Sequence, residues 1–128
     1  MIISYIRLYE KRYFFMKFDE LVEKLNLLEY HQKLLIKMLS ETEQSFYKLV
    51  VEKSLKEKDV AALFSLCDKL SIDLKDQKAE GFVHFNPLFE KFETSLHPNL
   101  QAEEVIRSCL KQRLFMPLME ELSRCVSN

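Results

Sequence analysis

The residue types that most often carry chemistry are scattered along this sequence rather than grouped. The histidines are His31, His84 and His97, and no two of them stand three or four residues apart. Zinc and di-iron sites in helical proteins take such pairs, or a glutamate three residues before a histidine, from facing helices. Neither spacing occurs, so we expect no metal ligands. His84 closely follows Gly81 in an irregular segment, and we interpret it as a partly exposed linker residue.

The three cysteines, Cys67, Cys109 and Cys125, are far apart, odd in number and surrounded by apolar residues. This pattern is typical of buried thiols in a reduced protein, not of a disulfide framework or a metal site. Cys67 could act as a nucleophile only with a histidine brought close by the fold. A single glycine cannot form a phosphate-binding loop, and no serine has a G-x-S-x-G context. We therefore predict no catalytic residue, no cofactor and no enzyme activity.

The composition favours one small helical domain. The chain has 128 residues, 48% of them hydrophobic, with one glycine and three prolines. Helices tolerate this scarcity, whereas tight β-turns need both residue types. Acidic and basic residues are interleaved to a net charge of −1, so a nucleic acid partner is not expected. Because no signal-peptide core and no stretch of roughly 18 apolar residues is present, we expect a cytoplasmic protein without a membrane partner.

Apolar residues at helical spacing predict an all-α fold of about five to six helices in one multihelical domain. Two S-x-x-E boxes, Ser40–Glu43 and Ser54–Glu57, predict where helices begin again, and Gly81 predicts a helix end with positive φ. The expected helices are 18–39, a second ending near Lys53, 55–80, one opening at Asn86-Pro87, one around Val105–Leu110, and one opening at Met116-Pro117.

The first of these helices has the pattern of a coiled coil. Alternating steps of three and four residues place one apolar or amide side chain at every a and d position, with Gln32 as the polar member. This predicts a homo-oligomer, either dimer or trimer, that acts through an unidentified protein partner. An ordinary bundle helix packed inside a monomer would give a similar pattern. The predicted interface is Phe18, Leu21, Leu25, Leu28, Gln32, Leu35 and Leu39.

The main alternative function is a DNA-binding regulator that uses a helix-turn-helix-like segment around 46–70. The second helix of that segment opens with Lys56-Glu57-Lys58-Asp59, which puts acidic groups where phosphate contacts are needed.

A separate hypothesis concerns the N-terminus. Residues 1–15 lack a clean helical period and Met16 is a second plausible start, so we expect 1–15 to be an extension outside the packed core and 16–128 to be the single helical domain.

Three stretches of the chain are similar to one known family. They are Glu29 to Leu35, Cys67 to Leu70 continuing through Gln77 to Val83, and Leu114 with Leu118 to Glu120. They resemble the YhaI-like proteins, a small helical family of uncharacterised function from Bacillus-type bacteria. The resemblance implies a multihelical, homo-oligomeric, cytoplasmic protein, and it implies no activity, cofactor or binding residue.

Overall fold

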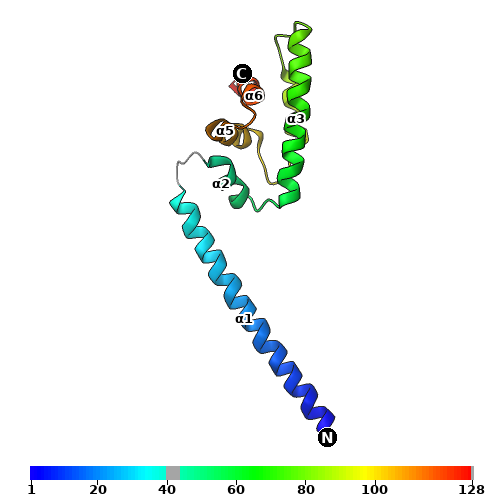
Figure 1. The fold of residues 1–128 in the computed structure, drawn as a ribbon, viewed down its shortest axis with the longest axis vertical. Helices are drawn as coiled ribbons and strands as arrows, with labels where there is room; N and C mark the ends of the chain where they lie inside the picture. Colours follow the sequence, from blue (N-terminus) through cyan, green and yellow to red (C-terminus); the bar gives the residue numbers. More distant parts are fainter. Residues whose placement is uncertain (40–43, 128) are drawn as a thin grey trace. The chain divides into compact units, whose positions relative to one another are not determined.

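The computed structural model describes residues 1–39 and 44–127. It contains six helices and, in those two ranges, no strand, which confirms the predicted all-α fold (Figure 1). The chain divides into two compact units, residues 1–38 and 39–128, and each is described by itself. The helices are α1 (Ile2–Met38), α2 (Ser45–Glu52), α3 (Glu57–Ala79), α4 (Asn86–Thr94), α5 (Ala102–Gln112) and α6 (Met116–Ser127).

The first unit is the single helix α1, which is 37 residues long and contains no buried residue. It begins at Ile2, well before the expected Phe18. No glycine or proline occurs between Met1 and Met38, so nothing in the backbone interrupts the helix. Residues 1–15 are therefore helical although their apolar pattern is irregular. Their place outside the packed core stays a prediction.

The second unit is a bundle of the five shorter helices around one apolar core. Helix α5 packs against both α2 and α6, and α3 packs against α4 and α6. Figure 1 shows α5 between α2 and α6 in this unit. All three cysteines are free thiols, and Cys67 and Cys109 are buried in the core as predicted, whereas Cys125 is only partly buried. The largest fully buried side chains are Phe46, Phe92, Leu70, Leu118, Met119 and Leu122.

Three helices end in the same way, on a residue with positive φ. These residues are Ser54 after α2, Gly81 after α3 and Arg113 after α5, with φ of 55°, 93° and 61°. Each donates its N–H to the carbonyl three residues back, at 3.1–3.2 Å, and the following residue donates to the carbonyl five residues back, at 2.9–3.0 Å. These paired bonds satisfy the last carbonyls of each helix. Only one of the three positions has the residue that adopts this conformation without strain.

The structure corrects the predicted Ser54–Glu57 box. Ser54 closes α2 instead of opening α3, and the capping carboxylate belongs to Asp59, whose Oδ2 accepts the Lys56 N–H at 2.9 Å. The other predicted box, Ser40–Glu43, lies outside the described residues. Helix α4 begins at Asn86 with Pro87 in its first turn, so its predicted start is correct to within one residue.

The start of α2 is held from the far end of the sequence. The Oε1 atom of Gln112, the last residue of α5, accepts the backbone N–H of Phe46 at 2.9 Å and of Tyr47 at 3.2 Å. These are two of the donors that a helix cannot satisfy internally. Gln112 therefore does from another helix what a serine or aspartate N-cap usually does locally.

We expect Gly81→Val to lower the free energy of unfolding by about 1–2 kcal/mol, because a side chain is strained at φ of 93°. Arg113→Gly is the matched opposite change, and it should raise the stability by up to about 1 kcal/mol, since the same strain is removed. Urea unfolding of both variants measures this. Equal shifts in the same direction would contradict the role assigned to these residues.

Gln112→Ala should lower the free energy of unfolding by about 1 kcal/mol, the usual cost of removing an N-cap. Gln112→Glu keeps an acceptor oxygen and adds a negative charge at a helix N-terminus, so it should leave the stability unchanged or raise it. Thermal unfolding followed by circular dichroism compares the two. A Glu variant as unstable as the Ala variant would show that the hydrogen bonds are not what Gln112 contributes.

Candidate oligomer interface

The structure leaves the predicted interface residues of α1 open to solvent. The apolar members on α1 keep between 53% and 61% of their surface exposed, and Gln32 is exposed as well. Leu39 differs, because it follows the last residue of α1, belongs to the other unit and is half-buried. We call the six residues on α1 the seam: Phe18, Leu21, Leu25, Leu28, Gln32 and Leu35.

The seam occupies one face of the helix. At 100° per residue its six side chains fall within an arc of roughly 100°. In a coiled coil such an arc faces the partner helix, and each side chain inserts between four residues of that partner. The predicted residues on α1 therefore lie in a register that a second helix can cover, and α1 by itself contains no buried residue.

The charged residues beside the seam would contribute little to the stability of an assembly. Glu29 stands at an e position and pairs within its own helix with Lys33, at 3.2 Å, and both side chains are about two-thirds exposed. A pair between Glu29 and Lys24 of another copy would compete with that contact. Exposed ion pairs of this kind are worth at most about 1 kcal/mol. The apolar seam, and not its charges, is the part that can hold copies together.

Residues 18–127 match the model of the family described as protein of unknown function DUF1878. The chain belongs to the DUF1878 family. The matched region begins at Phe18, the first residue of the seam, and it includes all of the second unit's helices. The seam is thus part of the family region, whereas residues 1–17 precede it.

The 46–70 segment of the DNA-binding alternative forms α2, a short turn and the first half of α3. Its apolar residues Phe46, Leu63 and Leu70 are buried in the core. At the start of α3 the Asp59 carboxylate receives the Lys56 N–H. A carboxylate at this position repels the phosphates that a recognition helix approaches, so this arrangement disfavours DNA binding. DNA binding itself stays untested.

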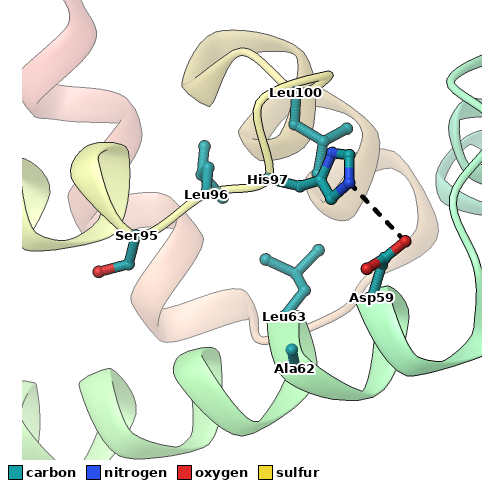
Figure 2. Close-up of a pocket in the computed structure, with 7 residues that line it drawn as sticks. All are labelled: Asp59, Ala62, Leu63, Ser95, Leu96, His97 and Leu100. Carbon is teal, nitrogen blue, oxygen red and sulfur yellow. Dashed lines mark ion pairs between the residues drawn. The ribbon is translucent and has the colours of Figure 1, made fainter.

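A small hollow of about 160 Å³ brings together a carboxylate and an imidazole that sequence reasoning did not connect. The Nε2 atom of His97 lies 3.8 Å from Oδ2 of Asp59, and Figure 2 shows the ring facing that carboxylate across the start of α3. The lining residues are Asp59, Ala62, Leu63, Ser95, Leu96, His97 and Leu100.

This pair does not form a catalytic arrangement. In a hydrolase triad the carboxylate holds one ring nitrogen and the other activates the nucleophile. Here Nδ1 of His97 already accepts the Asn99 N–H at 3.0 Å, while Nε2 faces Asp59. Nδ1 is thus occupied by the backbone, and 3.8 Å is too long for a hydrogen bond between Nε2 and Asp59. The same loop is tied to α2, because Asn99 Nδ2 donates to the Lys53 carbonyl at 3.1 Å, so the contacts fasten the α4–α5 connection to the α2–α3 turn.

The thiols are protonated rather than reactive. Burial raises the pKa of Cys67 and of Cys109 to about 12. Burial and the nearby Glu121 carboxylate also raise the pKa of Cys125, which shares a surface hollow with His84. Nucleophilic cysteines need the opposite shift. Among the described residues no cluster of three or more histidines, cysteines or carboxylates could hold a metal ion, and no helix there is long and apolar enough to cross a membrane.

The raised thiol pKa values predict a loss of stability at alkaline pH. In the folded protein Cys67 and Cys109 stay protonated up to about pH 12, whereas the unfolded chain ionises them above the ordinary value of 9.0. Their contribution is therefore complete below pH 9 and disappears between about pH 9 and pH 12. Urea midpoints measured across this range should fall more steeply for the wild type than for Cys67→Ala. Identical slopes would contradict the assignment.

Proposed function

We propose that this protein is a non-catalytic module that assembles with copies of itself through the seam of α1 and acts through a protein partner bound by the assembly. The observation that carries the proposal is a seam of five large apolar side chains, each more than half exposed, on a helix with nothing buried. A continuous apolar face of this kind is typical of an interaction surface.

Burial of the seam is large enough to drive association. Each of its leucines and its phenylalanine contributes about 1.5–3 kcal/mol when fully buried. Because 53–61% of the surface of these side chains is left to bury, five of them from each of two copies supply on the order of 8–17 kcal/mol, against about 4–15 kcal/mol for lost translational and rotational freedom. Association also stabilises α1 itself, because a helix that packs against nothing has only its own backbone bonds to hold it.

A parallel arrangement fits the seam better than an antiparallel one. In parallel register Gln32 faces Gln32 of the next copy, so the two amides can hydrogen-bond to each other. In antiparallel register Gln32 would face Leu21, and its amide would be buried without a partner. The amide pair supports a defined register at some cost in stability, and it is compatible with a dimer or a trimer.

The proposal includes the cellular location of the protein and its place within the family. Three free thiols support a reducing compartment such as the cytoplasm. The stretches Glu29–Leu35 and Gln77–Val83 support a place near the YhaI-like proteins of Bacillus-type bacteria within the family.

The paired change Leu25→Asn and Leu28→Asn should reduce the assembly to monomers, because it places two amides in the centre of the seam. The second unit should remain folded, with its helical circular dichroism signal intact. Sedimentation velocity at micromolar concentration measures the change in mass.

The matched control is Leu27→Asn with Leu34→Asn, which alters the same residue type on α1 outside the seam. Both leucines are exposed in the structure. The control should keep the wild-type mass. Dissociation by the control pair, or unfolding of the second unit by the seam pair alone, would contradict the proposed interface.

A further inference from the structure

Residues 2–17 of α1 carry a second apolar stripe on a face that differs from that of the seam, while Ile3, Leu8, Phe14 and Phe15 lie outside it. Its members are separated by three or four residues, apart from the adjacent Tyr5 and Ile6, and at 100° per residue their arc is centred roughly 120° away from the centre of the seam. Followed toward the N-terminus, the heptad positions of the seam hold Phe14 and then Lys11, Arg7 and Ser4. All of these residues are exposed. The N-terminal stripe consists of Ile2, Tyr5, Ile6, Tyr9, Tyr13 and Met16.

The N-terminal stripe also ends sharply. One and two turns beyond Met16 its positions are occupied by Glu20 and Glu23, both exposed. A partner helix that covers the seam therefore leaves the N-terminal stripe in water. The family match begins at Phe18, so the stripe belongs to the part of the chain that precedes the family region.

The same two parts of α1 also differ in net charge. Residues 1–17 hold four basic side chains and one acidic side chain, a net charge of +3, while residues 18–38 hold three basic and four acidic side chains, a net charge of −1. Arg12 and Lys17 border the N-terminal stripe on its two sides, roughly 20° beyond its edges. The Nζ atom of Lys17 lies 3.8 Å from Oε2 of Glu20 and 5.6 Å from the centre of the Tyr13 ring, and both contacts are at the surface.

We propose that residues 1–17 lie in the surface of an anionic lipid bilayer, with the N-terminal stripe in the acyl boundary and the basic residues at the headgroups. Helices that bind in this way combine an apolar face with lysine and arginine residues. Tyrosine is enriched at that depth because its ring is apolar and its hydroxyl is polar, and three tyrosines occur in the stripe. Long basic side chains at the stripe's edges can extend to the phosphates while their stems stay in the apolar layer.

The charge decides between a bilayer and a second copy as the occupant. Two segments of net charge +3 repel each other, whereas anionic lipid attracts them. Binding in the membrane surface is compatible with the finding that no described helix can cross a bilayer. It differs from the sequence-based expectation of no membrane partner, which considered only spanning helices. It does not depend on self-association through the seam.

The test is co-sedimentation of the full chain with vesicles. Binding to vesicles that contain phosphatidylglycerol should be at least tenfold stronger than binding to phosphatidylcholine alone, and it should weaken with salt. Arg12→Gln with Lys17→Gln should reduce the binding to anionic vesicles about tenfold or more. Lys33→Gln with Lys37→Gln removes the same charge from the other half of α1 and should leave the binding unchanged.

Equal binding to both kinds of vesicle, equal effects of the two charge pairs, or no binding by the wild type would each overturn the proposal. The variant Ile6→Ser with Tyr9→Ser distinguishes a lipid bilayer from a second copy as the occupant of the stripe. It should lose vesicle binding while keeping the wild-type mass. A fall in the mass of that variant in the absence of vesicles would show that a second copy covers the stripe, and it would also overturn the proposal.

Discussion

The exposed seam of α1 is the constraint on which the account depends. Five large apolar side chains on one helical face cannot stay in water at low cost, and no residue of α1 is buried. The second unit differs, because its five helices enclose a core of aromatic, aliphatic and cysteine side chains, although Ile72, Phe82 and Val83 are exposed. The seam is therefore the surface through which we propose that this protein binds.

Several polar side chains of the second unit have structural roles. Its polar groups are used to fasten helices to one another. Gln112 holds the start of α2, Asp59 holds the start of α3, and His97 and Asn99 hold the α4–α5 connection. Each of these side chains already serves the backbone or another side chain. The buried thiols keep their protons, so they too contribute packing rather than reactivity.

Much of this fold could be predicted from the sequence because the relevant signals are local. Proline at 87 and at 117, the single glycine and the apolar periods locate helices and their ends within a few residues. Ser54 was misassigned because an S-x-x-E pattern is compatible with the end of one helix as well as the start of the next. The role of Gln112 could not be predicted, since its hydrogen-bond partners are 65 and 66 residues away in sequence. The early start of α1 was missed because an irregular apolar pattern does not prevent a helix when no residue breaks it.

The mass of the wild-type chain in solution tests the central claim most directly. One copy has a mass of 15.3 kDa. Static light scattering at micromolar concentration should give a whole multiple of that value, two or three copies, because we propose that another copy covers the seam. A mass of one copy at this concentration, with α1 still helical, would contradict the account.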